Sequence, residues 1–106
     1  MKTVLAAAAL LAAAISTAPA QAASFNCSYA KLPAEVAICQ YGDLSGYDEE
    51  MASLYYQAIH NNDDYNTKTI KREQKWFIKA RNRCGYGYDC LRDIYVGRIG
   101  ALQGWN

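Results

Sequence analysis

Four cysteines, Cys27, Cys39, Cys84 and Cys90, follow an N-terminal apolar segment in a chain of only 106 residues. A chain this short buries a small hydrophobic core, and small exported domains commonly add disulfide bonds to compensate. An even number of cysteines in an exported chain is typical of a disulfide framework. We therefore expect all four cysteines to be oxidised.

Four cysteines allow three disulfide pairings, and the sequence does not decide among them. We favour Cys27 with Cys39 and Cys84 with Cys90, because each of these bonds closes only a short segment. Two glycines between Cys84 and Cys90 make the second closure easy.

Residues 1–22 are predicted to be a secretory signal peptide. Lys2 gives a positive start, residues 4–15 are almost wholly apolar, and small residues flank Gln21, which is typical of a cleavage site after Ala22. Cleavage after Ala20 or Ala23 is the alternative. The apolar run is shorter than the roughly 20 residues of a membrane-spanning helix, so no membrane anchor is expected. The product is predicted to be periplasmic or secreted.

The remaining residues, 23–106, are predicted to form one domain. The full chain has a formal net charge of +1, and loss of Lys2 with the signal makes basic and acidic residues equal in number. General nucleic-acid binding depends on a net positive field, so this balance argues against a nucleic-acid partner. The oligomeric state stays open.

Apolar residues recur at spacings of three and four, which predicts helices and no strand. The expected fold is all-α: a small disulfide-stapled bundle of about four helices, the second and third forming an antiparallel hairpin. Pro33, Asp43 and Asp89 are expected at or beside helix starts, and Thr67 or Thr69 is expected to cap the third helix. The predicted helices are 33–39, 43–60, 67–83 and 89–104.

Charge is segregated along the chain. Residues 27–66 carry seven acidic residues against Lys31 alone, and residues 67–106 carry nine basic residues against three acidic ones. In one interpretation the opposite charges complement each other between neighbouring helices. In the other, the acidic second helix offers a face to a cationic partner.

Few residues suggest catalytic or metal chemistry. His60 is the only histidine and has no cluster of other ligands near it in the sequence, and the cysteines lack a C-x-x-C spacing. Asp43, Asp48, Glu49 and Glu50 could form the carboxylate pair of a glycosidase, but on a small helical domain they are expected to be a solvated face. We expect no enzyme activity, no metal and no cofactor.

Asp48 and Arg81 lie within or beside the apolar stripes of two helices that should pack together. We predict that they form a partly buried ion pair, which would fix the register of the hairpin more than its stability. The alternative is that both side chains point to water.

Tyrosines are frequent, and two of them, Tyr86 and Tyr88, lie in the glycine-rich turn between Cys84 and Cys90. Rigid, exposed aromatic side chains are effective contacts in protein interfaces. Tyr86 and Tyr88 are therefore candidate partner contacts, together with the acidic residues Asp43, Glu49 and Glu50.

The four cysteines form an ordered set with residues of the predicted helices: Cys27, Pro33, Ala34, Glu35, Ile38, Cys39, Leu44, Asp48, Tyr55, Glu73, Gln74, Phe77, Ile78, Arg81, Cys84, Cys90, Leu91, Tyr95, Arg98, Ile99 and Leu102. This ordered set resembles the LprI-type lysozyme-inhibitor-like domain of exported bacterial proteins, over nearly all of residues 23–106. At three positions, Tyr47, Phe77 and Asn82, that family usually has Leu, Trp and Asp.

This resemblance implies an exported, non-enzymatic binding protein that blocks the cleft of a lysozyme. Lysozymes are often strongly cationic, so the acidic residues would attract one while a loop enters its cleft. The family's shared residues carry the fold, and a fold does not determine function. The alternative is a periplasmic module that binds another protein or the cell wall without inhibiting anything.

Overall fold

The computed structural model describes residues 23–106, and the predicted signal peptide lies outside these described residues. The described chain is all-α: a 3-10 turn, η2 (Cys27–Tyr29), is followed by four helices. These are α2 (Pro33–Gln40), α3 (Gly42–Asn61), α4 (Asp64–Arg83) and α5 (Tyr88–Trp105). The predicted fold class is confirmed.

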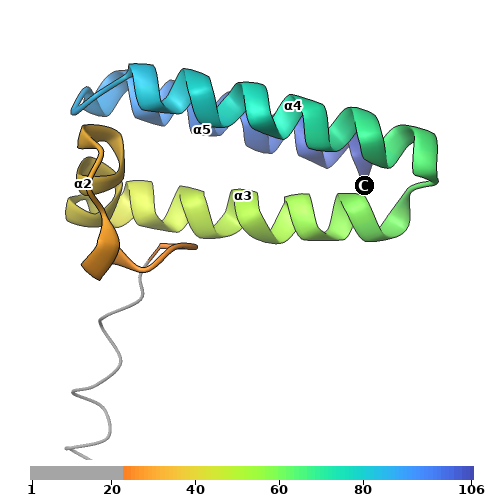
Figure 1. Ribbon diagram of the computed structural model, residues 1–106, viewed down its shortest axis with the longest axis horizontal. Coiled ribbons are helices and arrows are strands. Elements are labelled where there is room, and N and C mark those ends of the chain that lie inside the picture. Colours follow the sequence, from red (N-terminus) through yellow and green to blue (C-terminus); the bar gives the residue numbers. More distant parts are fainter. Residues whose placement is uncertain (1–22) are drawn as a thin grey trace, which may run out of the picture.

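The three long helices lie side by side, and α2 packs across one end of them (Figure 1). Helices α3 and α4 form the predicted antiparallel hairpin, joined by a turn at the far end from α2. Helix α5 returns along both and packs most extensively against α3. The α2–α3 junction and the α4–α5 turn therefore meet at the same end of the bundle.

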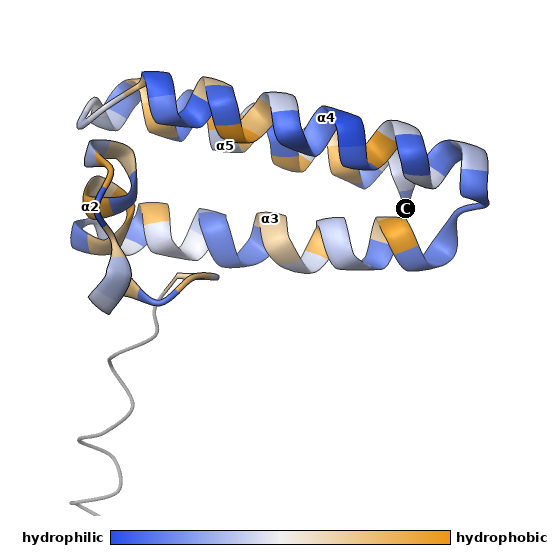
Figure 2. Ribbon diagram, in the orientation of Figure 1, coloured by the Kyte–Doolittle hydropathy of each residue, from blue (hydrophilic) through white to orange (hydrophobic). Residues whose placement is uncertain are grey.

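The core lies between the helices and contains at least one apolar residue from each. Figure 2 shows orange positions interspersed along α3 and α5, whereas α4 is largely blue on its outer side. The rings of Phe77 and Tyr95 pack edge to face at a centroid distance of 5.1 Å. The other large or central buried residues are Ala34, Ala37, Ile38, Leu44, Met51, Ala58, Ile70, Leu91, Ile99 and Leu102.

Both favoured disulfide pairings are present. Cys27 is bonded to Cys39, which ties η2 to α2, and Cys84 is bonded to Cys90, which closes the turn between α4 and α5. The two disulfides agree with an oxidising compartment outside the cytoplasm.

Helix α2 begins at Pro33 as predicted, whereas α3, α4 and α5 begin one to three residues earlier than the sequence predicted. Asp63 caps α4 by accepting a hydrogen bond from the Asn66 amide at 2.8 Å, so the Thr67 and Thr69 caps expected from the sequence are wrong. Asp43 and Asp89 lie in the first turns of their helices instead of capping them. Both still favour helix formation, because a carboxylate near a helix N-terminus stabilises the helix dipole.

Candidate functional site

The candidate site is the end of the bundle where the α4–α5 turn meets the α2–α3 junction. We call it the aromatic tip and define it as Tyr41, Asp43, Tyr86, Tyr88 and Arg92. Three different segments supply these five residues, and the Cys84–Cys90 disulfide closes one of them.

The turn that carries Tyr86 needs its two glycines. Gly85 has a positive φ of 56°, a backbone conformation that residues other than glycine rarely adopt. A Cβ at Gly87 would lie 3.0 Å from the carbonyl oxygen of Cys84. That close approach lets the Gly87 amide donate a hydrogen bond to the same oxygen, at 3.0 Å. The turn is thus held by backbone hydrogen bonds as well as by its disulfide.

Tyr86 and Tyr88 have different environments although they are two residues apart. Tyr86 is 63% exposed and projects from the turn. Tyr88 is half-buried: its hydroxyl donates a hydrogen bond to the carboxylate of Asp43, and its ring packs edge to face on Tyr41 at 5.1 Å. Tyr86 is therefore the side chain free to enter a partner, and Tyr88 joins the turn to α3.

The pKa of Tyr88 is raised above its usual value. The main cause is the hydrogen bond that its hydroxyl donates to Asp43, followed by loss of solvation and by the negative charge of Asp43. Tyr88 is thus a neutral donor at physiological pH, and Asp43 is its acceptor. The structure brings these two predicted contact residues together, so the Asp43 carboxylate is already engaged within the molecule.

Arg92 completes the tip. Its guanidinium carbon lies 5.9 Å from the centre of the Tyr88 ring, and its nitrogens lie 3.4 Å from Asp89 and 3.1 Å from Asp93. These pairs are exposed, where an ion pair contributes little stability, at most about 1 kcal/mol. One arginine thus stands beside three carboxylates, Asp43, Asp89 and Asp93, and neutralises their charge only in part.

Glu49 and Glu50 lie on α3, one to two turns beyond the tip. Both are exposed, and neither is within 4.0 Å of a basic group in the described chain. Both carboxylates could attract a cationic partner at a distance and also contact it directly, whereas the Asp43 carboxylate keeps its charge but already accepts the Tyr88 hydrogen bond. Tyr41 and Arg92 were missed as tip residues, because only the fold brings the α2–α3 junction beside the α4–α5 turn.

Asp48 and Arg81 are both buried, but the direct ion pair expected from the sequence is not formed. Asp48 accepts hydrogen bonds from the Tyr95 hydroxyl at 2.6 Å and from the Ser24 amide at 2.7 Å, and also from the Ser24 hydroxyl. Neutral donors therefore satisfy this carboxylate. Within residues 23–106 no Arg81 nitrogen lies within 4.0 Å of an Asp48 oxygen.

Arg81 pairs with groups at the α2 end of the bundle. Its Nη2 lies 2.8 Å from Asn82 Oδ1 and 3.9 Å from Glu35 Oε2. A second buried arginine, Arg98, donates to Gln74 at 2.9 Å and lies 3.7 Å from Glu73, which ties α5 to α4. Burial lowers the pKa of Arg98, and Glu73 opposes that shift. The Arg98 contacts thus join two of the long helices, whereas the Arg81 contacts lie at the same end of the bundle as the tip but involve none of its five residues.

His60 makes local contacts only: its ring stacks on Tyr56 at 4.0 Å, and Nδ1 lies 2.8 Å from the Tyr56 carbonyl oxygen. Among residues 23–106, no three His, Cys, Asp or Glu side chains are grouped as a metal ion would require. No helix in the same range combines the length and apolar character needed to cross a bilayer.

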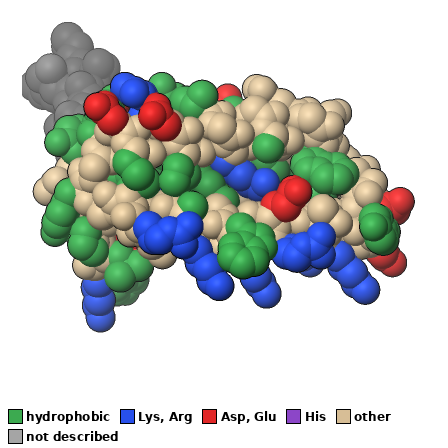
Figure 3. Space-filling view, turned by 90° about the horizontal axis from the view of Figure 1, so that it is seen from above, with side chains coloured by type: hydrophobic (Ala, Val, Ile, Leu, Met, Phe, Trp, Pro, Cys, Tyr) green, Lys and Arg blue, Asp and Glu red, His purple; other side chains and the backbone are tan. Residues whose placement is uncertain are grey.

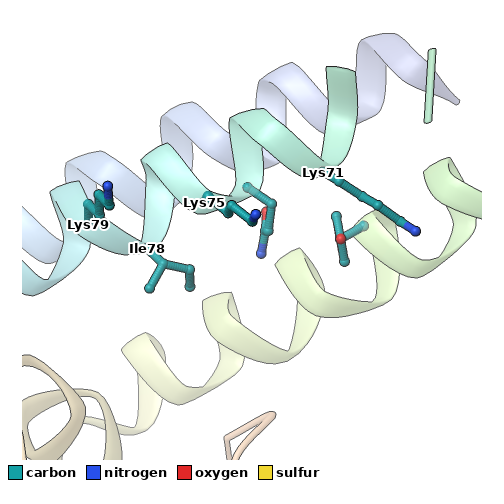
Figure 4. A pocket seen from close by; sticks show the side chains of 6 residues that line it. Lys71, Lys75, Ile78 and Lys79 are labelled. Atoms are coloured by element: carbon teal, nitrogen blue, oxygen red, sulfur yellow. The ribbon is translucent and has the colours of Figure 1, made fainter. Parts of the chain in front are cut away.

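The molecule also has a groove of about 430 Å³ between α3 and α4, away from the tip. Tyr55, Gln74 and Ile78 line it, and three lysines, Lys71, Lys75 and Lys79, follow one another along its α4 side (Figure 4). Its lining is mostly apolar and its border is positively charged.

Comparisons of the chain with protein-family models, with curated proteins and with solved structures found no match.

Proposed function

We propose that this chain is an exported, non-enzymatic binding protein that inhibits a lysozyme by placing the aromatic tip in its cleft. The observation that carries the proposal is the environment of Tyr86: a largely exposed ring on a turn closed by a disulfide and by backbone hydrogen bonds. The lysozyme itself comes from the resemblance described above.

A preformed turn favours binding, because little conformational entropy is lost when a partner immobilises it. The Tyr88–Asp43 hydrogen bond and the Tyr41–Tyr88 ring contact hold the turn against α3. Tyrosine also combines a large apolar area with a hydroxyl, and this suits a polar cleft that contains carboxylates.

The acidic residues of α3 are assigned a separate role. Glu49 and Glu50 are exposed and unpaired, so they would accelerate association with a cationic lysozyme without entering its cleft. Replacing both with glutamine should slow association and weaken its salt dependence, while dissociation changes little.

The test is inhibition of several lysozyme types by the purified domain, with peptidoglycan as substrate. Tyr86→Ala should weaken inhibition by about 30-fold or more, the loss typical of a central interface residue. Tyr65→Ala is the matched control, because Tyr65 is 79% exposed and lies at the opposite end of the bundle. Full lysozyme activity at excess wild-type protein would reject inhibition.

If inhibition is absent but Tyr86→Ala abolishes capture of one envelope protein, the tip serves an interaction module without inhibitory activity. Cross-linking from a photoreactive residue at position 86 in exported material would identify that protein directly.

A further inference from the structure

Helix α4 carries a row of positive charge that the rest of the molecule does not neutralise. Six of its basic residues are exposed, and none lies within 4.0 Å of a carboxylate in the described chain. The four ion pairs of residues 23–106 involve only Arg81, Arg92 and Arg98. We call these six, with the two exposed aromatic residues of the helix, the basic face: Tyr65, Lys68, Lys71, Arg72, Lys75, Trp76, Lys79 and Arg83.

The segregated charge is complemented by a direct contact at one place in the described chain, where Arg81 of α4 lies 3.9 Å from Glu35 of α2. No ion pair of the described chain joins α3 to α4, so the acidic and basic helices do not complement each other through direct contacts. Like charges at four-residue spacing destabilise a helix by about 0.2–0.5 kcal/mol per pair. Lys71, Lys75 and Lys79 form such a series, and so do Lys68 and Arg72. An external anion would relieve this repulsion.

The basic face is long and convex. From residue 65 to residue 83 it extends roughly 27 Å, at about 1.5 Å per residue. In Figure 3, which views the molecule from above, Lys and Arg side chains project in a row along the lower edge, with a hydrophobic side chain between them. The positive groups point outward over a broad arc of the helix and do not surround a narrow channel.

Trp76 lies in the middle of this row and is 62% exposed, although its neighbour Phe77 is buried. The amine of Lys79 lies 5.2 Å from the centre of the Trp76 ring. Tyr65, which is 79% exposed, lies near the start of the same face. Exposed Trp and Tyr among Lys and Arg are typical of helices that lie at the boundary between lipid headgroups and water.

We propose that the basic face binds peripherally to a membrane surface rich in anionic phospholipid, with α4 lying in the plane of the headgroups. The six basic side chains are long and flexible and lie on one face of α4, so their charged ends can reach one anionic surface together, and exposed Trp76 and Tyr65 suit the boundary between headgroups and water. A strongly cationic lysozyme would be repelled by this face, so this surface is distinct from the aromatic tip. The groove beside Lys71 and Lys75 is lined mostly by apolar atoms, which could contact the glycerol and first acyl carbons of a bound lipid.

The test is sedimentation of the purified domain with phosphatidylcholine vesicles, compared with vesicles of equal parts phosphatidylcholine and phosphatidylglycerol. We expect binding only to the acidic vesicles, and a steep loss of binding as salt is added. Arg72→Glu should weaken binding about 30-fold, because it removes one attraction and adds one repulsion at the lipid surface. Arg92→Glu is the matched control, since it changes the net charge equally but lies at the tip.

Trp76 gives a second, independent readout. In a Trp105→Phe background it is the only tryptophan, and its fluorescence should shift to shorter wavelength on acidic vesicles as the ring leaves water. The proposal is overturned if the wild-type domain binds neither vesicle at low salt, or both equally. It is also overturned if Arg92→Glu weakens binding as much as Arg72→Glu, or if soluble polyphosphate is bound and acidic vesicles are not.

Discussion

At the scale of single residues, the best-defined polar centre of the molecule is Asp48. Its side chain is fully buried, and three hydrogen bonds from Tyr95 and Ser24 satisfy it. A buried carboxylate that loses a donor bears a desolvation cost of about 1–3 kcal/mol. This centre explains why a polar residue is tolerated in the middle of an apolar stripe.

Tyr95→Phe should therefore lower the free energy of unfolding by about 1–3 kcal/mol. It should also change the response to alkali. Burial, and then the charge of Asp48, raise the pKa of Tyr95 above the value of about 10 expected for unfolded tyrosine. The folded state thus holds this proton more tightly, so the associated stability is present below about pH 10 and is lost as the pH rises beyond it.

Urea denaturation between neutral and alkaline pH measures both effects. The alkaline loss should be smaller in Tyr95→Phe than in the wild type, whereas exposed Tyr65→Phe should leave the curve unchanged. A double-mutant cycle gives a further check: Asp48→Asn should couple more strongly to Tyr95→Phe than to Arg81→Met. Equal couplings would contradict the hydrogen bonding described above.

The position of Asp48 beside an apolar stripe led to a prediction of partial burial, with exposure to water as the alternative, and its partners were not predictable. Ser24 and Tyr95 are 24 and 47 residues away in the sequence, on segments that only the fold brings to α3. Arg81 was the natural choice from charge alone. Two neutral hydroxyls and an amide satisfy Asp48, because a carboxylate can be satisfied by hydrogen bonds without a cation.

At the scale of elements, helix periodicity predicted the four helices, and local cap chemistry decided their ends. Asp63, Thr67 and Thr69 are all residue types that can cap a helix. Asp63 is the one that caps α4, so the helix begins at Asp64 and includes the last residues of the polar segment. The contacts among Tyr41, Asp43 and Tyr88 at the tip could not be predicted from the sequence, because they depend on how α2 crosses the bundle.

Helix α5 contains two glycines that reduce its stability and that its packing does not require. Gly97 and Gly100 are exposed, and a Cβ at either position would meet nothing within 4 Å. Neither glycine is required by close packing, so each weakens the helix relative to alanine. Gly97→Ala and Gly100→Ala should each raise the free energy of unfolding by about 0.5–1 kcal/mol.

Thermal or urea denaturation of the two alanine variants tests this directly. Gly87→Ala is the contrasting variant, because a Cβ there would press on the Cys84 carbonyl oxygen at 3.0 Å and should destabilise the turn. Destabilisation by Gly97→Ala would contradict this prediction, because it would mean that the added methyl group meets another part of the molecule.

At the scale of the whole molecule, the two disulfides stabilise different regions. Each closes a short segment, with 12 and 6 residues of separation, and should contribute about 2–3 kcal/mol. Against a total stability of about 5–15 kcal/mol for a domain, the two together are a large share. One lies near the N-terminal segment and the other shapes the aromatic tip.

Paired serine variants separate these contributions. Replacing Cys27 and Cys39 together, or Cys84 and Cys90 together, should lower stability by similar amounts in urea denaturation. If the tip is the inhibitory surface, only the second pair should also impair lysozyme inhibition at a temperature where both variants are folded. Equal impairment by both pairs would assign the effect to general stability.

The contact between Ser24 and Asp48 makes residues before the first cysteine part of the folded unit. The first cysteine and the first helix both come later, so a chain trimmed to begin at Cys27 would retain every helix and both disulfides. In such a chain, however, the buried carboxylate of Asp48 would keep only the hydrogen bond from Tyr95 among the three described above. Cleavage after Ala20, Ala22 or Ala23 keeps Ser24, whereas trimming beyond Ser24 would alter the interior of the bundle as well as its edge.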